Sequence, residues 1–220
     1  MNSAELVADT ISIKKQPYLV VKRILDIVIS LFGLIVFSPV LLIVAIAIKL
    51  ESKGPILYAH DRIGQYGKLF RFYKFRSMVY DADDILYNKL LKDEEMAEEY
   101  KINKKLNRDP RITKVGRFLR KTSMDELPQL WNVLKGDMSL VGNRPYMPRE
   151  KEDMGEYFND IVKTKPGLTG YWQVSGRSNK SFKKRLKLEQ EYSNIYSFKL
   201  DVKIFFKTFF VVFNHDGGAK

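Results

Sequence analysis

The chain has 220 residues, of which 45% are hydrophobic and 29% are charged. This length and composition fit one globular domain with a membrane segment attached, and they exclude a wholly disordered chain, which would be poorer in apolar residues. The absence of cysteine excludes disulfides, thiolate zinc sites and thiol nucleophiles, and two histidines are too few for a metal site built from several histidines.

The formal net charge is +12, from 38 basic and 26 acidic residues. A basic chain attracts anionic partners, which include nucleic acid, the anionic face of a membrane and phosphorylated small molecules. The alternative is a well-solvated basic surface without a specific partner. Charge alone does not choose between these interpretations.

Residues 1–20 are polar and lack periodicity, so we expect a poorly ordered lead-in. No small-residue cleavage site precedes the apolar segment, and a secretory signal peptide is not expected. From Ile27 to Ile48 the chain then has 22 residues without a charge, and about 20 suffice to span a bilayer core. The alternative is a buried core helix, but such helices rarely run this far without a charged residue.

The middle of this apolar run contains Ser38 and Pro39, where we expect a kink or break because proline lacks a backbone N–H. Both flanks of the run are basic, and Lys and Arg favour the cytoplasmic side. The pattern therefore predicts a helix that enters the membrane, turns and leaves on the same face, with a kinked full span as the alternative. Asp26 is expected to pair with Arg23 at the interface.

Beyond the apolar run, the sequence alternates between strand-like, helical and turn segments. Residues 55–80 predict short strands with Gly64 and Gly67 in turns. Helices are expected at 81–106, 112–121, 125–137 and 181–193, and loops at 142–148 and 166–170. The fold class is therefore α+β, a small mixed domain with many short helices.

The last predicted helix carries Lys199, Lys203 and Lys207 at every fourth position, and therefore along one face. Apolar residues accompany this basic stripe, a composition typical of a helix lying on an anionic membrane surface. An ordinary amphipathic core helix is the alternative. The apolar face consists of Phe205, Phe206, Phe209, Phe210 and Phe213.

The chain has no phosphate-binding Walker loop, no His-Glu-x-x-His and no Gly-x-Ser-x-Gly. The adjacent carboxylates Asp125 and Glu126 follow several basic residues and precede an apolar stretch. Phosphoryl transfer needs cations around the phosphate, a metal bound by a carboxylate and an in-line nucleophile, which an aspartate can supply. A structural salt-bridge network is the alternative. Candidate phosphate-binding cations are Lys74, Arg76, Arg120 and Arg144.

On these residues the chain resembles the bacterial sugar transferases, the monotopic polyprenyl-phosphate phosphoglycosyl transferases. The resemblance covers nearly the whole chain from Lys22 to Phe213, in the minimal catalytic form of the family. It implies an N-terminal re-entrant membrane helix and amphipathic interfacial helices around the mixed domain. The matching stretches are residues 22–58, Lys-Phe-Arg-Ser-Met at 74–78, residues 109–145, and Lys-Pro-Gly-Leu-Thr-Gly-Tyr-Trp-Gln-Val-Ser-Gly-Arg-Ser at 165–178.

By this resemblance, Asp125 matches the family nucleophile, which attacks the sugar-linked phosphate of a UDP-sugar and expels UMP. Glu126 matches the residue that binds Mg²⁺, and a polyprenyl (undecaprenyl) phosphate then takes the phospho-sugar from the aspartate. Arg120 and Arg144 match arginines near the phosphates. Lys74 and Arg76 match basic positions of the Lys-Phe-Arg motif, and Ser38-Pro39 matches the break of the re-entrant helix.

The resemblance further implies a location at the cytoplasmic face of the inner membrane, with membrane lipids as partners. We expect a lead-in at 1–20, the re-entrant helix at 21–52, the cytosolic transferase domain at 53–213 and a tail at 214–220. The Tyr-Trp-Gln-Val-Ser-Gly-Arg stretch and residues 147–150 resemble the branch that transfers galactose or glucose phosphate. The loop from Pro166 to Arg177 is expected on the nucleotide-sugar side. The pathway product, individual roles in that loop and any homo-oligomer remain open.

One position departs from the family pattern. The family usually has Gly-Pro-Arg-Pro where this chain has Gly142, Asn143, Arg144 and Pro145. Loss of that proline is expected to loosen the turn that positions Arg144, although asparagine tolerates turn conformations and activity should survive.

Two other functions compete with this assignment. A membrane-linked nucleic-acid binder would explain the net charge but not the uncharged run, and no nucleic-acid-binding motif is evident, so nucleic acid is not an expected partner. A catalytically inert scaffold of the same fold is the second rival, and the intact Asp125-Glu126 pair argues against it.

Overall fold

A computed structural model describes residues 3–103, 106, 108–176 and 181–213. The tail at 214–220 that the sequence predicts, and Arg177 at the end of the expected nucleotide-sugar loop, lie outside these residues. The chain divides into two compact units, each built from separate stretches. The first unit comprises residues 1–36, 60–72 and 129–217, and the second comprises residues 37–59, 73–128 and 218–220.

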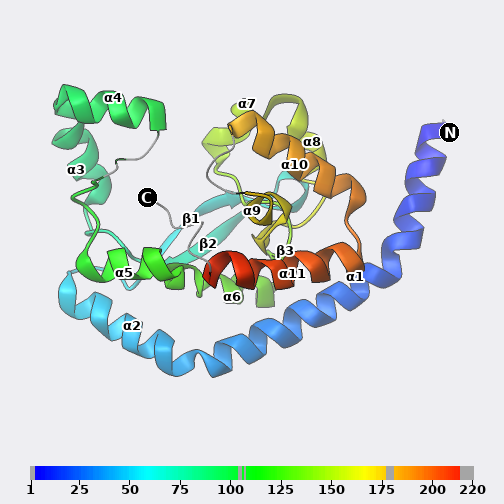
Figure 1. The fold of residues 1–220 in the computed structure, drawn as a ribbon, viewed down its shortest axis with the longest axis horizontal. Coiled ribbons are helices and arrows are strands. Elements are labelled where there is room, and N and C mark those ends of the chain that lie inside the picture. Colours follow the sequence, from blue (N-terminus) through cyan, green and yellow to red (C-terminus); the bar gives the residue numbers. More distant parts are fainter. Residues whose placement is uncertain (1–2, 104–105, 107, 177–180, 214–220) are drawn as a thin grey trace. The chain divides into compact units, whose positions relative to one another are not determined.

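Helices dominate both units, and the strands are short (Figure 1). This confirms the mixed class with many short helices. The helices are α1 Ser3–Val36, α2 Ser38–Glu51, α3 Ala82–Asn88, α4 Glu94–Asn103, α5 Lys114–Thr122, α6 Gln129–Lys135, α7 Lys151–Met154, α8 Phe158–Ile161, α9 Tyr171–Val174, α10 Phe182–Ile195 and α11 Phe198–Phe213. The strands are β1 Leu57–Ile63, β2 Leu69–Phe75, β3 Ser139–Val141 and β4 Gly167–Thr169.

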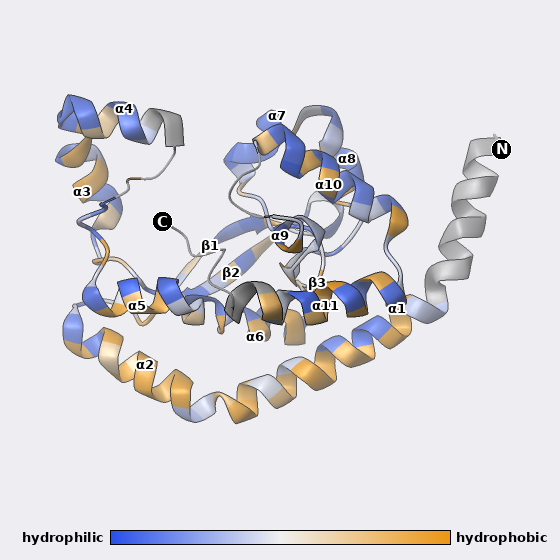
Figure 2. Cartoon of the chain, in the orientation of Figure 1, coloured by the Kyte–Doolittle hydropathy of each residue, from blue (hydrophilic) through white to orange (hydrophobic). Residues whose placement is uncertain are grey.

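The apolar run forms the end of α1 and nearly all of α2, and the helix breaks where Ser38 and Pro39 predict it (Figure 2). Pro39 occupies the first turn of α2, where no N–H is needed within the helix. Among the described residues, no single helix is long and apolar enough to cross a membrane. Residues 17–36 and 38–51 meet the length and composition criteria only as a pair, bent by 60°.

The lead-in that the sequence leaves without regular structure is helical, because α1 already begins at Ser3. Residues 4–8 and 13–16 include Ala, Glu, Leu, Lys and Gln, which favour helix strongly. Pro17 lies inside the same helix. The lack of amphipathic periodicity in this segment therefore did not indicate a lack of helix.

The charged residues at the start of the apolar run bind the body of the first unit. Arg23 donates from Nη1 and Nη2 to the carbonyl oxygens of Val133 and Leu134, each at 2.7 Å, at the end of α6. Asp26 accepts from Ser139 Oγ at 3.0 Å and from the Leu140 N–H at 2.9 Å. The expected interfacial hydrogen-bonded pair of Asp26 with Arg23 is therefore wrong, because each side chain satisfies a backbone group far away in sequence.

A second polar contact joins α1 to α11 within the first unit. Lys22 forms an ion pair with Asp201 and donates to the Val141 carbonyl at 2.8 Å. The hydroxyls of Tyr18 and Tyr192 also donate to Asp201, at 2.5 and 2.8 Å. The buried carboxylate of Asp201 thus anchors α1 just ahead of its apolar part.

The segment 166–170, predicted as a loop, contains strand β4. Strand β4 pairs with β3 in parallel, with Ser139 opposite Gly167 and Val141 opposite Thr169. A Cβ on Gly167 would lie 2.1 Å from the Gly142 nitrogen, so the backbones approach more closely than any side chain allows. The sequence prediction missed this strand because its pairing is non-local and it contains only three residues.

Apolar packing in the first unit forms two clusters. One surrounds β3 and includes Val133, Met138 and Ile204, all essentially inaccessible to solvent. The other lies where α7, α8 and α10 meet, and it includes Tyr146 and Leu186. These clusters fix α6, α10 and α11 against the short parallel sheet.

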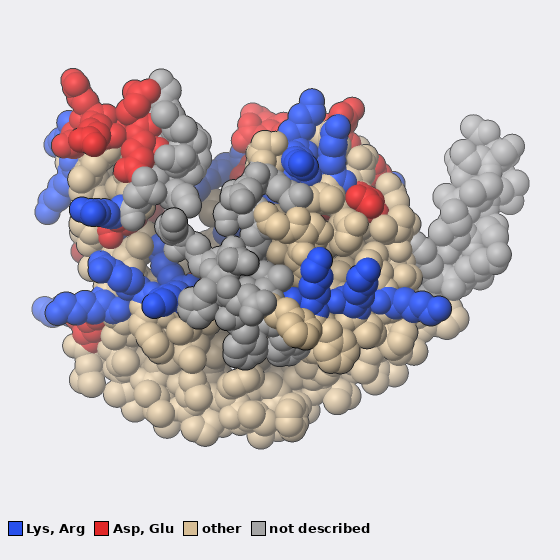
Figure 3. All heavy atoms as spheres, viewed as in Figure 1, with Lys and Arg blue, Asp and Glu red and all other residues tan. Residues whose placement is uncertain are grey.

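The second unit has its own core, in which Val44, Ile48, Phe75 and Leu119 pack together. This core joins α2, the end of β2 and α5. Acidic side chains gather over α3 and α4 of the same unit, whereas the surface over the apolar parts of α1 and α2 is free of charge in the view of Figure 3. The helices expected between 81 and 106 are thus present, and their charges face solvent.

Candidate active site

The end of β2 supplies the first member of the site, Lys74. Successive strand residues point to opposite faces, so that Phe75 enters the core of the second unit while Lys74 points the other way. The Lys74 Nζ lies 2.9 Å from Glu126 Oε1 and 3.6 Å from Asp125 Oδ2. The structure therefore brings three predicted site residues together across about 50 residues of sequence.

Helix α5 supplies the second cation, Arg120. Its N-terminus begins after Thr113, whose hydroxyl accepts from the Gly116 N–H at 2.9 Å. Gly116 and Leu119 form the buried face, and a Cβ on Gly116 would lie 2.0 Å from the Ser77 oxygen. Arg120 follows on the neighbouring face and donates from Nε to Ser77 Oγ at 2.9 Å.

A tight turn carries the chain from α5 to the carboxylates. Ser123 adopts the left-handed conformation, with φ 57° and ψ 16°, and ends α5 by donating its N–H to Arg120 O. A single 3-10 turn, Met124–Glu126, follows. Asp125 is 8% exposed, whereas the side chain of Glu126 is 39% exposed. One carboxylate is therefore sequestered and its neighbour faces solvent.

The sequestered carboxylate has a perturbed proton affinity. Burial raises the pKa of Asp125, and the adjacent charge of Glu126 raises this pKa further. The positive charges of Lys74 and Arg120 act in the opposite direction. Burial likewise lowers the pKa of Arg120, which nevertheless stays protonated because guanidinium is so basic. The buried anion thus lies in the field of two cations, one on β2 and one on α5.

Two neighbours of Arg120 were not predicted from the sequence. One is Ser77, described above. The other is Asp109, which is buried and accepts from Arg111 Nε at 2.8 Å and Nη2 at 2.6 Å. Burial alone would raise the pKa of Asp109, but the hydrogen bonds and charge of Arg111 lower this pKa, and the charge of Arg120 lowers it further. The sequence offered only a weak signal for this pair, an acidic and a basic residue separated by Pro110.

Arg76, a predicted phosphate ligand, has different partners. It is 5% exposed, and its Nη1 and Nη2 donate to the Lys53 and Ser52 carbonyl oxygens at 2.6 and 2.8 Å. These oxygens follow the C-terminal end of α2. Arg76 follows the last residue of β2, and its guanidinium contacts the end of α2, whereas Lys74 contacts the carboxylates.

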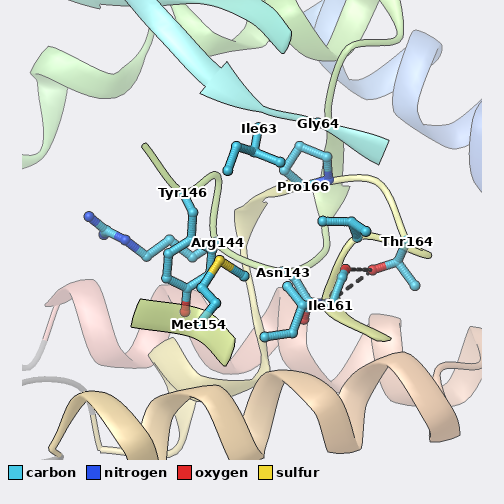
Figure 4. Close-up of a pocket in the computed structure, with 10 residues that line it drawn as sticks. Ile63, Gly64, Asn143, Arg144, Tyr146, Met154, Ile161, Thr164 and Pro166 are labelled. Atoms are coloured by element: carbon cyan, nitrogen blue, oxygen red, sulfur yellow. Dashed lines mark hydrogen bonds between the residues drawn. The ribbon is translucent and has the colours of Figure 1, made fainter. Parts of the chain in front are cut away.

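Arg144 belongs to the first unit, and its contact with phosphate stays a prediction. Its backbone N–H donates to Glu189 Oε1 at 3.3 Å. Figure 4 shows its guanidinium pointing away from a small pocket beside Asn143. That pocket has room for about one water molecule, so it is too small to receive a nucleotide.

Asn143, which stands where the family usually has proline, is 3% exposed. Its amide donates to Ile161 O at 3.0 Å and to Thr164 Oγ1 at 3.2 Å, two residues drawn in Figure 4. It also donates to Ser193 Oγ at 2.7 Å. That loss of the proline loosens the turn stays a prediction, and the contacts of the Asn143 amide act against it. The side-chain amide ties the segment before Arg144 to α8 and α10.

The cations and carboxylates also bear on metal binding. In the described part of the chain, no three His, Cys, Asp or Glu side chains converge on a ready-made metal site. Mg²⁺, however, is usually bound by one or two carboxylates, with substrate phosphates and water completing its shell. Asp125 and Glu126 match this donor chemistry, and Glu126 is accessible to solvent. The pair is therefore compatible with a metal that arrives with a phosphorylated substrate.

Comparisons with known proteins agree on one family. A family model for bacterial sugar transferases matches residues 17–215. The undecaprenyl-phosphate galactose phosphotransferase of Salmonella typhimurium is 45% identical over 196 residues, covering 89% of this chain and 41% of that protein. The UDP-glucose:undecaprenyl-phosphate glucose-1-phosphate transferase of Escherichia coli is 38% identical over 197 residues, covering 86% and 39%.

A relative of similar size is the exopolysaccharide production protein ExoY of Sinorhizobium fredii. It is 40% identical over 187 residues, covering 85% of this chain and 83% of that protein. By contrast, the chain spans about two fifths of the length of the Salmonella and Escherichia relatives. The matched region includes every residue of the candidate site.

Proposed function

Because the chain belongs to the bacterial sugar transferase family, we propose that it transfers a sugar-1-phosphate from a UDP-sugar to undecaprenyl phosphate and releases UMP. The observation that carries this proposal is the position of Lys74 Nζ, 3.6 Å from the buried carboxylate of Asp125 and 2.9 Å from its more exposed neighbour Glu126. A nucleophile, a metal-binding carboxylate and a cation for the phosphate oxygens are the components that this reaction requires.

In the first step, a carboxylate oxygen of Asp125 attacks the sugar-bearing phosphorus of the UDP-sugar. The bond from that phosphorus to the bridging oxygen breaks, and its electron pair leaves with UMP. The product is an acyl phosphate, in which the sugar phosphate is bonded to the Asp125 carboxylate oxygen. Lys74 and Arg120 supply the positive charge that this step needs, because both already compensate the Asp125 carboxylate.

In the second step, a phosphate oxygen of undecaprenyl phosphate attacks the same phosphorus. The bond to Asp125 breaks, and the carboxylate is regenerated. The product is an undecaprenyl diphosphate sugar, the first membrane intermediate of a surface polysaccharide or glycoconjugate. Two sequential displacements at one phosphorus predict ping-pong kinetics.

Mg²⁺ would be bound by Glu126, with oxygens of the donor diphosphate as further ligands. Bound there, it would neutralise charge on the phosphate and on departing UMP. Lys74 Nζ donates to Glu126 Oε1 and holds this carboxylate beside Asp125. Arg144 is proposed as a further phosphate-binding residue, and Arg76 is left out of the phosphate site because backbone carbonyls take up its guanidinium.

The proposed location is the cytoplasmic face of the inner membrane, where α1 and α2 form the re-entrant helix. Large apolar side chains on both helices are exposed, which supports contact with lipid. Helix α11 adds a second contact, because its exposed face carries Phe206 and Phe210 beside the lysines at 199, 203 and 207. Phe209 and Phe213 lie outside the described side chains.

The test is an assay with radiolabelled UDP-galactose or UDP-glucose, undecaprenyl phosphate in detergent and Mg²⁺. Appearance of labelled lipid and an equal amount of UMP is expected, with one of these sugars preferred over their N-acetylated analogues. Single-turnover incubation without the lipid should leave label on the protein. Absence of labelled lipid and of UMP with all donors would favour the inert scaffold.

A further inference from the structure

We propose that Glu51 and Arg76 are positioning residues that fix the end of the proposed membrane helix α2 to the catalytic helix α5. This inference rests on the proposed function. Glu51 and Arg76 are not reacting groups themselves, but they position Arg120 and Lys74. All the contacts that support it lie within the second unit.

The first contact is made by the Glu51 side chain, the last residue of α2. The Glu51 Oε1 accepts from the Lys114 N–H at 2.6 Å, and Oε2 accepts from the Val115 N–H at 3.0 Å. The first N–H groups of a helix have no partner inside it. Thr113 Oγ1 satisfies only the third of them, at Gly116, so Glu51 completes the N-terminus of α5 from a distance of 63 residues in sequence.

The second contact is made by Arg76 at the other side of the same junction. Its Nη2 donates to Ser52 O at 2.8 Å and Ser52 Oγ at 2.9 Å, and its Nη1 donates to Lys53 O at 2.6 Å. A cation at a helix C-terminus also balances the partial negative charge there. Since Arg76 is buried while Glu51 is exposed, the junction has one inner and one outer contact.

Ser77, the residue after Arg76, connects the same backbone segment to α5. Its carbonyl oxygen accepts from the Thr113 N–H at 3.2 Å, and its hydroxyl accepts from Arg120 Nε at 2.9 Å. The backbone that carries Arg76 therefore contacts both the beginning and the functional end of α5. Apolar packing of Ile48, Phe75 and Leu119 fills the space between these polar contacts.

A shift of the α2 end is thereby transmitted to both cations of the site. Lys74 precedes Arg76 by two residues on β2, and Arg120 follows the N-terminus of α5 by two helical turns. A misplacement of reacting groups by about 1 Å can reduce a rate about 100-fold. Helix α2 therefore positions the phosphate-binding residues Lys74 and Arg120, in addition to anchoring the enzyme in the membrane.

The test compares Glu51→Ala and Glu51→Gln with Glu95→Gln, which removes the same charge from an exposed position on α4 of the same unit. Each full-length variant is purified in detergent. We measure kcat and KM for the UDP-sugar, thermal unfolding, and amide hydrogen exchange of peptides covering α5. Glu51→Gln keeps one carbonyl oxygen as an acceptor and serves as the conservative variant, and it also stands in if Glu51→Ala does not fold.

We expect Glu51→Ala to lower kcat about 10- to 100-fold with KM changed less than about 3-fold. Lys74 and Arg120 are still present in this variant, but they are misplaced. Exchange at the start of α5 should accelerate at least 10-fold, and Glu51→Gln should recover part of both losses. Glu95→Gln should behave as the unmodified chain. Faster exchange in α5 with unchanged kcat would overturn the positioning role, and so would unchanged exchange.

A double-mutant cycle with Arg76→Lys tests whether the two residues act through one junction. The combined loss in kcat should be smaller than the product of the single losses, because either change already releases the α2 end. Fully multiplicative losses would overturn the shared role. Hydrogen exchange does not depend on turnover, so its result stands even if the unmodified chain releases no UMP and the proposed function fails.

Discussion

Lys74 Nζ lies 3.6 Å from Oδ2 of Asp125, and this contact joins the end of a strand to a single 3-10 turn 50 residues later. It places a cation against a carboxylate that is 8% exposed. Removing either charged side chain of this pair changes both the reactivity and the pKa of the other.

Asp125→Asn should abolish turnover without loss of stability. The amide cannot form the acyl phosphate intermediate, so kcat should fall on the order of 10³-fold or more. Folding raises the pKa of Asp125, and its ionised form at pH 7 therefore disfavours the folded state. The neutral amide removes that penalty, so the melting temperature should be equal or higher. Assays of UMP release and calorimetry check both parts, with Glu95→Gln as the control. Retained turnover would refute the nucleophilic role.

The pH dependence of activity should report the altered Asp125. Its pKa lies above the ordinary aspartate value of 3.8, and the protonated acid cannot attack phosphorus. As the pH falls through the raised pKa, kcat/KM should therefore decline. Removal of the Lys74 charge by Lys74→Met should move this decline to higher pH, whereas Glu126→Gln should move it to lower pH.

Both shifts can be measured by ¹³C NMR titration of the Asp125 carboxyl carbon, which needs no turnover. The profile of UMP release in the unmodified enzyme supplies the kinetic comparison. Movement of the titration in the same direction in both variants would contradict the assigned electrostatics.

Asn143→Ala should destabilise the first unit by about 1–3 kcal/mol, because it removes three hydrogen bonds of a buried amide. Denaturant unfolding measures this loss. Asn159→Ala, at an exposed position on α8, is the matched control and should change the free energy of unfolding by less than about 0.5 kcal/mol. Equal stability of the two variants would show that the Asn143 amide does not tie the segment to α8 and α10.

Gly116→Ala should displace α5 and lower kcat about 100-fold, since the new Cβ would lie 2.0 Å from the Ser77 oxygen. The Ser77 backbone cannot move aside as the end of a flexible side chain can. Gly33→Ala provides the comparison, because its Cβ would meet the flexible end of the Leu130 side chain, with Cδ1 at 3.1 Å and Cδ2 at 3.9 Å. Activity and melting temperature of the two variants are measured together. Normal activity in Gly116→Ala would mean that the contact between α5 and Ser77 is not required.

Much of the fold could be predicted because its signals are local. The break at Ser38 and Pro39 follows from the chemistry of proline, and α5 follows from a capping threonine and a helix-favouring sequence. Strand β4 could not be predicted, because three residues acquire strand geometry only by pairing with β3. Helix at the start of α1 was missed because amphipathic periodicity was taken as a requirement for helix.

Some features of the candidate site could likewise be predicted from the sequence, and others could not. The Asp125-Glu126 pair and its nearby cations could be selected from residue types and family motifs, since the chemistry of phosphoryl transfer limits the choice. Which cation contacts the carboxylates could not be selected, because Lys74 and Arg76 are both basic and only two residues apart. Lys74 lies on β2 and contacts the carboxylates, whereas Arg76 lies just past the end of β2 and contacts the end of α2. Only the tertiary fold decides these partners.

The sequence by itself determined the apolar run with its break, the basic character of the chain and the residue types available for catalysis, since these depend on composition and on short-range backbone chemistry. Tertiary structure alone decided the partners of Asp26, Arg76 and Asn143. Each of these polar side chains is buried, and a buried polar group takes whichever donor or acceptor the fold brings to it, however distant in sequence.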